Sequence, residues 1–146
     1  MTQPRAGGRV LGVDLGSRRI GLALSDPTRT IASPLEVIER QRSHEADHRA
    51  IVAIARANDA ATIVVGLPLS LSGETGPAAR ATLDEIEAMR ATAGEEVAVE
   101  AFDERLTTVT AERSLQEARM RRDARRRVVD KVAAAVMLQT YLESNR

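Results

Sequence analysis

The chain has 146 residues, 43% of them hydrophobic and 29% charged, and a formal net charge of zero. This length and composition match one ordinary globular domain with a hydrophobic core and exclude two lobes of usual size. The chain contains no cysteine and only two histidines, which excludes disulfides and thiolate metal sites and argues against a histidine-rich zinc centre. A bound metal would therefore be a hard ion held by carboxylates, such as Mg²⁺ or Mn²⁺.

We expect residues 1–8 to form a flexible N-terminus and residues 9–146 to form a single domain. The first residues lack the apolar core of a signal peptide, and no later apolar run is as long as a membrane-spanning helix. We therefore expect a cytoplasmic protein with no membrane partner. The sequence carries no indication of the oligomeric state.

Residues 9–15 and 20–25 are predicted to form two strands joined by a turn that begins at Gly16. Asp14 lies at the end of the first strand, where α/β sheets bind ligands. Its neighbours are apolar, and an ionised carboxylate among them costs several kcal/mol unless it is paired or binds a cation. Two interpretations remain open for Asp14: a metal or phosphate site, or a turn in which nearby N–H groups satisfy the carboxylate.

A third, short strand is predicted at residues 35–38, followed by a helix over residues 43–58 with Ser43 as its N-cap. His44 and His48 are four residues apart, a spacing that can bind a metal on a helix face. Charged residues surround them and no third ligand is close in the sequence, so we interpret this side of the helix as a solvated face. The charged neighbours are Arg42, Glu45, Asp47 and Arg49.

Residues 62–66 are β-branched and apolar, the pattern of a strand buried on both faces. A loop over residues 69–77 then leads into a helix predicted at residues 78–91, and Pro77 suits the first helical position. Small residues before a helix N-terminus expose N–H groups to an anion, so the loop is either a phosphate contact or a simple capped loop. It is not a P-loop, because no Gly-Lys-Ser/Thr motif follows.

The last predicted strand covers residues 97–102. Two acids, Asp103 and Glu104, come directly after it and resemble Asp14 in their placement at the end of a strand. A helix is predicted next, at residues 109–118.

The final predicted helix, residues 128–144, carries Asp130 on its apolar stripe, so this carboxylate should face the protein body. Arg126 or Arg127 in the preceding turn can pair with it. The stripe also contains Ala133, Ala134, Met137 and Tyr141.

Carboxylates held against apolar structure are thus expected at Asp14, at the acidic pair after the last strand, and at Asp130. If they converge, their mutual repulsion requires a divalent cation. Two such ions about 3.5–4 Å apart activate water and stabilise the leaving oxygen in phosphodiester hydrolysis. A glycosidase pair is the weaker alternative, because the two aromatic residues, Phe102 and Tyr141, offer no platform for sugar rings.

Residues 119–131 contain seven basic residues and two acidic ones, a net charge of +5, which leaves the rest of the chain at −5. We interpret this segment as a connection before the last helix that holds a nucleic-acid backbone. A solvated connection without a ligand is the alternative. The basic residues are Arg119, Arg121, Arg122, Arg125, Arg126, Arg127 and Lys131.

The predicted order of elements is three strands, then a helix, a strand, a helix, a strand and two helices. By the usual rules of connection, this order forms an α/β sheet in which an antiparallel meander is extended by parallel strands through helical crossovers.

Four stretches of the chain, in their order and spacing, resemble the YqgF/RuvX family of RNase H-like nucleases. They are VDLGSRRIGLALSD, VVGLPLSLSGETGPAA, FDERLTTVTAE and VVDKVAAAVMLQTYL, and the resemblance covers nearly the whole chain. It implies a ribonuclease H-like α/β fold, with a mixed five-stranded sheet flanked by helices. It also implies a metal-dependent nuclease that acts in 5′-end processing of precursor 16S ribosomal RNA.

The resemblance assigns the catalytic and metal-binding carboxylates by position to Asp14, Glu104 and Asp130, with Mg²⁺ or Mn²⁺ as the cofactor. Asp103 is kept as an alternative metal ligand, because strand alternation does not decide between the two adjacent acids. The nucleic-acid substrate is expected to contact Arg18, Arg105, Arg121, Arg122, Arg125, Arg126 and Arg127.

Three other functions compete with this one. A Holliday-junction-type DNA resolvase is similar, but RuvC-like enzymes carry two acids in the last helix, whereas here Asp123 lies in the basic segment and only Asp130 lies in the predicted helix. A ribosome assembly factor that binds nucleic acid without cleaving it would have no need of all the acids. The turn after Asp14 also resembles the phosphate element of actin-like ATPases, but those proteins close two domains over ATP and this chain has room for one.

Overall fold

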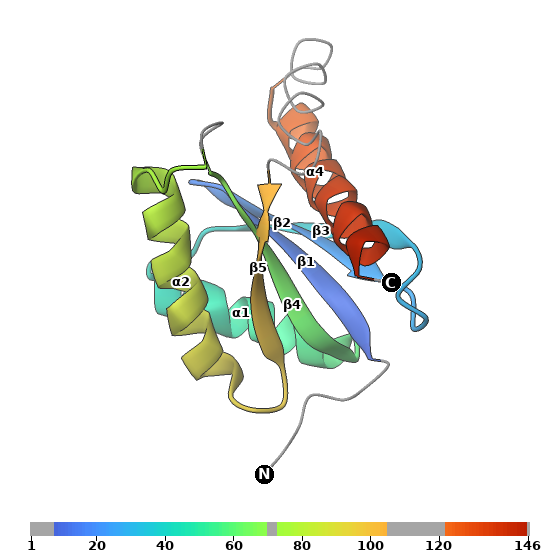
Figure 1. The fold of residues 1–146 in the computed structure, drawn as a ribbon. Helices are drawn as coiled ribbons and strands as arrows, with labels where there is room; N and C mark the ends of the chain where they lie inside the picture. Colours follow the sequence, from blue (N-terminus) through green and yellow to red (C-terminus); the bar gives the residue numbers. More distant parts are fainter. Residues whose placement is uncertain (1–7, 70–72, 105–121, 146) are drawn as a thin grey trace.

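A computed structural model describes residues 8–69, 73–104 and 122–145, with side chains in the last range described from Val129 onward. The expected flexible N-terminus therefore lies outside the described residues, apart from Gly8. Within the described ranges, none of the helices has the length and apolar composition that a bilayer crossing requires. The strands are β1 (Arg9–Leu15), β2 (Arg19–Ser25), β3 (Ala32–Glu39), β4 (Ala60–Leu67) and β5 (Ala98–Asp103), and the helices are α1 (His44–Ala57), α2 (Pro77–Ala93) and α4 (Arg122–Ser144) (Figure 1).

The strands form one five-stranded sheet in the order β3-β2-β1-β4-β5. β1, β2 and β3 pair antiparallel as a meander, whereas β4 and β5 run parallel to β1. α1 and α2 cover one face of the sheet, and α4 crosses the other face (Figure 1). The predicted mixed α/β sheet flanked by helices is therefore confirmed.

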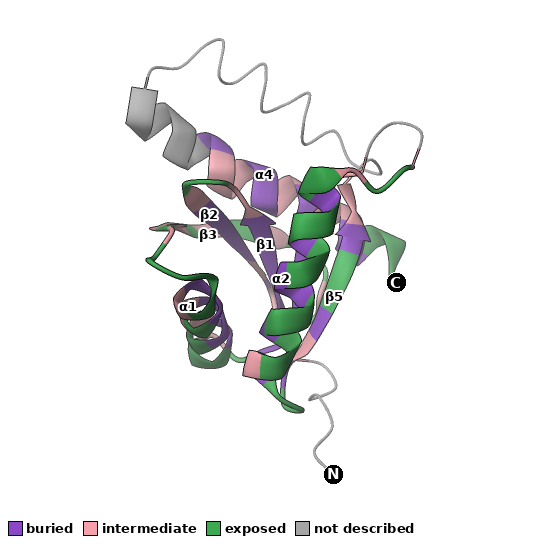
Figure 2. Ribbon diagram, turned by 90° about the vertical axis from the view of Figure 1, so that its left-hand side faces the viewer, coloured by how far each residue is buried: buried purple, intermediate pink, exposed green. Residues whose placement is uncertain are grey.

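Alternating side chains of β1 and β4 supply both hydrophobic layers of the core. Leu11, Val13 and Ile63 belong to the layer under α1 and α2, and Val10 and Val64 belong to the layer under α4. Both strands are buried along almost their whole length, which confirms the prediction of a strand buried on both faces. Figure 2 shows these buried central strands beside helices whose outer sides are exposed.

Two helix starts agree with the residues predicted for them. The Ser43 side chain accepts a hydrogen bond from the N–H of Ala46 at 3.1 Å, which confirms Ser43 as the N-cap of α1. Pro77 occupies the first turn of α2, where a missing N–H costs nothing. α2 ends at Ala93 and is followed by Gly94 as its C-cap, whose φ of 71° favours glycine.

β3 is longer than expected. The prediction covers residues 35–38, but pairing with β2 extends from Ala32 to Glu39. Pro34, which is predicted to precede the strand, lies inside it beside a shift in the register. An edge strand accepts this proline because one side of its backbone needs no partner strand.

α4 begins at Arg122, earlier than the predicted start at Val128. The interpretation of residues 122–127 as a connection before the helix is therefore wrong. Arginine is a good helix former, and this segment contains no glycine or proline that would interrupt a helix. The helix predicted at residues 109–118 lies outside the described residues.

One side of α1 also differs from the prediction. Arg42, Glu45 and Arg49 are exposed as expected, but Asp47 and His48 are each only 1% exposed, so the interpretation of a solvated face is wrong for these two residues. Both residues lie one helical turn before the buried Ile51. Their burial is stabilised by Arg40, which binds Asp47, and by Glu85, which binds His48.

Candidate functional site

Asp14 lies near the end of β1 on the face of the sheet that α4 covers. Its direction follows from strand alternation, because Val10 packs in the layer under α4 and a Cβ atom on Gly12 would lie 2.9 Å from the Cβ of Leu138. Asp14 is 9% exposed, so its carboxylate sits at the margin of the buried layer. The first predicted ligand therefore lies between the sheet and α4.

Glycines flank Asp14 on both neighbouring strands. Gly21 of β2 is its partner in the antiparallel register. On the other side, Val13 of β1 pairs with Val65 of β4, so Gly66 comes next to Asp14. Adjacent strands are only about 4.8 Å apart. Gly21 and Gly66 have no side chains, so other elements can lie over the sheet on both sides of Asp14, and at Gly21 the approach leaves no room for a Cβ atom.

α4 makes the first of these approaches at Gly21. A Cβ atom on Gly21 would overlap the backbone carbonyl oxygen of Asp130, and would lie 2.6 Å from its carbonyl carbon and 3.3 Å from its Cβ. Asp130 thus lies over the residue that is paired with Asp14. The predicted stripe is confirmed, since Ala133, Ala134, Met137 and Tyr141 are all buried.

Glu104 makes the second approach, at Gly66. A Cβ atom on Gly66 would lie 3.5 Å from Oε1 of Glu104 and 3.6 Å from Cγ of Met137 on α4. Asp103 instead continues the ladder between β4 and β5, paired with Leu67. Of the two adjacent acids, Glu104 is therefore the one whose carboxylate lies over the glycine next to Asp14.

Arg19 is a partner of Asp130 that sequence analysis did not identify. Its Nε donates a hydrogen bond to Oδ2 of Asp130 at 3.3 Å, and the two side chains are 12% and 21% exposed. The pair joins the start of β2 to α4 across 111 residues of sequence. The expected partners Arg126 and Arg127 have side chains outside the described part of α4.

The three acids share one face of the sheet without forming a ready ligand set. Among the described side chains, no three of the His, Asp and Glu types converge closely enough to hold a metal ion. The donor chemistry nevertheless fits a hard divalent ion, because all three donors are carboxylates. Arg19 already brings one positive charge to Asp130, so a divalent ion at this position would replace one cation by another.

Most of the predicted substrate contacts fall on side chains that the structure does not describe. Arg18 is exposed in the turn between β1 and β2. Arg105 and Arg121 lie outside the described residues, as does part of the loop over residues 69–77, the candidate phosphate contact. The others, Arg122, Arg125, Arg126 and Arg127, lie in the first part of α4. These assignments stay predictions.

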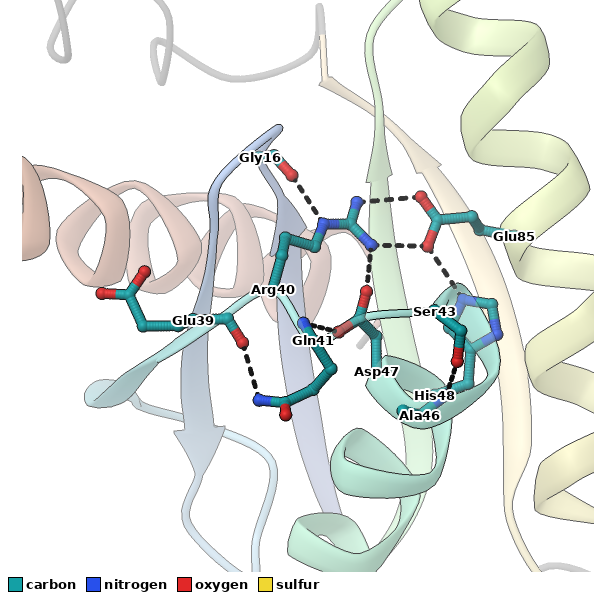
Figure 3. A network of polar contacts seen from close by, with 9 residues as sticks. All are labelled: Gly16, Glu39, Arg40, Gln41, Ser43, Ala46, Asp47, His48 and Glu85. Carbon is teal, nitrogen blue, oxygen red and sulfur yellow. Dashed lines mark hydrogen bonds and ion pairs between the residues drawn. The ribbon is translucent and has the colours of Figure 1, made fainter.

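Sequence analysis also missed a buried polar network on the opposite face of the sheet (Figure 3). Arg40 donates from both terminal nitrogens to Glu85, at 2.8 and 2.9 Å, and from Nη1 to Asp47 at 2.9 Å. Nε2 of His48 lies 2.8 Å from Oε1 of Glu85. The available signal was the helical stripe that Asp47 and His48 share with Ile51.

The charges of this network stabilise one another. Hydrogen bonding to Glu85 raises the pKa of Arg40 against the opposing effect of burial. Burial acts to raise the pKa of Glu85, but hydrogen bonds from Arg40 and His48 outweigh it and hold this pKa below its ordinary value. Arg40 and Glu85 are therefore both ionised at neutral pH.

Comparison with known sequences gives a consistent result. A sequence model of the family described as "RuvX: Holliday junction resolvase" matches residues 8–144. A protein of Mycobacterium sp. (strain KMS) named "Putative pre-16S rRNA nuclease" is 42% identical over 139 residues, which cover 95% of this chain and 82% of that protein. A protein of the same name from Kineococcus radiotolerans is 47% identical over 136 residues, covering 93% of this chain and 72% of that protein.

Among solved structures, the one described as "T. thermophilus RuvC in complex with Holliday junction substrate" is similar, with a TM-score of 0.57. The similarity covers 94% of this chain and 96% of that chain. The two sequences are 15% identical, so the likeness concerns the fold alone. The expected ribonuclease H-like fold is thereby confirmed.

Proposed function

The chain belongs to the RuvX family, and we propose that it hydrolyses phosphodiester bonds with a divalent metal ion held by Asp14, Glu104 and Asp130. That the chain is a nuclease follows from the family and from the named relatives. The observation that supports the residue assignment is that Asp14 lies between two glycines on the neighbouring strands. Asp130 lies over Gly21, and Glu104 lies over Gly66.

Mg²⁺ or Mn²⁺ is the proposed cofactor, because the donors are carboxylates without thiolate or imidazole. When bound, such an ion supplies an activated water and stabilises charge on the leaving oxygen. The protein's part is to position the donors: β1 holds Asp14 in the sheet, and the contact at Gly21 holds the backbone of Asp130 over the neighbouring strand. Arg19 pairs with Asp130 in the structure, and its guanidinium would also be suited to bind a phosphate oxygen of the substrate.

We propose precursor 16S ribosomal RNA as the substrate, with processing at its 5′ end. This proposal is supported by relatives that carry this substrate in their names at 42% and 47% identity. The basic residues at the start of α4 would neutralise backbone phosphates. Such a substrate places the protein in the cytoplasm. Cleavage of a four-way DNA junction is the second candidate, favoured by the description of the family.

The test compares cleavage of precursor 16S RNA and of a four-way DNA junction by the wild type and by Asp14→Asn, with Mg²⁺, with Mn²⁺ and with a chelator. We expect cleavage of the RNA only with metal, and Asp14→Asn to be on the order of 10²–10³-fold slower. Asp84→Asn is the matched control, because it makes the same change at an exposed position of α2 and should stay within about twofold of the wild type. Unchanged cleavage by Asp14→Asn would contradict the proposed ligand set. If the wild type cleaved the DNA junction faster than the RNA, the junction would be the better substrate and the RNA proposal would be wrong.

A further inference from the structure

The turn between β1 and β2 is held from the opposite face of the sheet by Arg40. The Nε of Arg40 donates a hydrogen bond to the carbonyl oxygen of Gly16 at 2.9 Å (Figure 3). The backbone N–H of Arg40 donates to the carbonyl oxygen of Arg18, also at 2.9 Å. One residue therefore binds both arms of the turn.

Arg40 itself has little freedom to move. Its guanidinium binds both oxygens of Glu85 and one oxygen of Asp47, whose side chains are 7% and 1% exposed. The second oxygen of Asp47 accepts the N–H of Gln41 at 2.6 Å. His48 binds Glu85 from α1. Removal of the guanidinium would leave two buried carboxylates without their common partner, so the network specifies one position for Arg40.

The turn held in this way carries residues of the proposed site at both ends. Asp14 lies two residues before Gly16, and Arg19, the partner of Asp130, closes the turn. The N–H of Gly16 donates to the carbonyl oxygen of Arg19 at 2.9 Å, and a Cβ atom on Gly16 would lie only 2.5 Å from that oxygen. The turn is therefore tight, and a displacement of Gly16 would shift its hydrogen-bond partner Arg19 and the end of β1 that carries Asp14.

We propose that Arg40 is a positioning residue for hydrolysis: through the carbonyl of Gly16 it fixes the turn that aligns Asp14 with the Arg19–Asp130 pair. The inference rests on the proposed function, since it assigns a role relative to that site. Asp47 and Glu85 act one step further away, by holding the guanidinium. Arg40 touches no substrate in this scheme, because its guanidinium points to Asp47 of α1 and Glu85 of α2, the helices on the face of the sheet opposite α4.

The informative variant is Arg40→Lys. A lysine keeps the positive charge beside Asp47 and Glu85, so the protein should fold, but one ammonium group does not bridge both carboxylates and also reach the carbonyl of Gly16. We expect kcat for RNA cleavage to fall by about tenfold or more, with KM little changed. Hydrogen exchange at the amide of Gly16, followed by NMR without substrate, should become about tenfold faster or more.

Arg29→Lys is the matched control. Arg29 also donates from Nε to a backbone carbonyl, that of Gly8 at 2.7 Å, and from Nη2 to Thr62, but it does so at the other end of β1. Any loss of stability should be compared by urea unfolding, and rates should be compared at equal folded fraction. The control should keep the wild-type kcat and the wild-type exchange at Gly16.

Two results would overturn the positioning role: wild-type kcat and Gly16 exchange in Arg40→Lys, or an equal loss of kcat in Arg29→Lys. Glu85→Gln is a second test, because it weakens the hydrogen bonds that position Arg40 without changing Arg40 itself. This variant should also lower kcat. Asp14→Asn separates the two proposals. If Asp14→Asn abolishes cleavage and Arg40→Lys does not lower it, only the positioning role fails. If Asp14→Asn cleaves normally, the proposed site fails and the positioning role fails with it.

Discussion

Gly21 and Asp130 approach so closely that a Cβ atom on the glycine would overlap the backbone carbonyl oxygen of the aspartate. α4 therefore rests directly on the backbone of β2. Because Gly21 is paired with Asp14, the missing side chain lets the backbone of Asp130 lie over the residue next to Asp14. Glycine is needed at this position because of a contact between residues far apart in the chain.

Gly21→Ala should disable the protein, whereas Gly66→Ala should be tolerated. The alanine at position 21 meets backbone atoms of α4, which cannot rotate away, and we expect a loss of about 1–3 kcal/mol in the free energy of unfolding. At Gly66 the nearest atoms are side-chain atoms of Glu104 and Met137 at 3.5–3.7 Å, an ordinary contact distance. The free energy of unfolding of Gly66→Ala should stay within about 1 kcal/mol of the wild-type value.

Urea unfolding and RNA cleavage measured on both glycine variants check this expectation. Cleavage by Gly21→Ala should fall even under conditions where the variant is fully folded, because Asp130 is displaced from Asp14. Equal stability and equal cleavage for the two variants would show that the contact between α4 and β2 does not set the position of Asp130.

Glu104 and Asp103 should differ as metal ligands. Glu104→Gln removes the charge that lies over Gly66, next to Asp14, and should slow cleavage on the order of 10²–10³-fold. Asp103→Asn changes a residue in the β4–β5 ladder and should slow it less than about tenfold. Titration of Mn²⁺ by calorimetry, without substrate, should show weaker binding in Glu104→Gln only. If cleavage and Mn²⁺ binding were instead weakened more in Asp103→Asn than in Glu104→Gln, Asp103 would be the metal ligand.

The stability of the protein should depend on the ionisation of Glu85. The pKa of Glu85 is lower in the folded protein than its ordinary value of 4.5: burial raises it, but the hydrogen bonds from Arg40 and His48 outweigh burial. A group with a lowered folded pKa stabilises the protein above its unfolded pKa, and this stabilisation is lost as the pH falls through the folded pKa. Glu85→Gln should therefore be less stable than the wild type at pH 7, by about 1–3 kcal/mol, with a smaller difference below pH 4.5.

Urea unfolding at several pH values between 7 and 3.5 measures this difference. Glu87→Gln is the control, because Glu87 lies on the same helix but is exposed and pairs with Arg90 at the surface. A difference between Glu85→Gln and the wild type that stays constant with pH would mean that ionisation of Glu85 does not stabilise the fold.

The basic segment of residues 119–131 should set the salt dependence of RNA binding. Neutralising Arg121, Arg122, Arg125 and Arg126 should weaken binding and flatten the slope of log K against log salt, by about 0.7–0.9 for each phosphate that the protein no longer neutralises. Filter binding or fluorescence anisotropy at several salt concentrations measures the slope. The control neutralises four exposed arginines outside α4, Arg42, Arg49, Arg56 and Arg80. Equal slopes for the two variants would show that the basic segment is a solvated surface that does not contact the RNA backbone.

The sequence alone was enough to predict most of the elements and the type of sheet. Alternation in β1 and β2, the apolar run of β4, the cap at Ser43 and the proline at the start of α2 are local signals. They act between residues within one or two turns of each other, so they can be read without a fold. The motif resemblance likewise named the acids by position.

Only the tertiary structure decided how distant residues meet. The contact of Asp130 with Arg19 joins residues 111 apart, and that of Arg40 with Glu85 joins residues 45 apart. Asp47 looked solvated because its neighbours in sequence are charged, but it is buried with Arg40 when α1 and α2 cover the sheet. Local pattern determines which residues form each element, whereas burial and pairing depend on which elements pack together. For this reason the sequence was enough to identify the candidate acids. Their positions in space depend on the packing of α4 and of the β1–β2 turn.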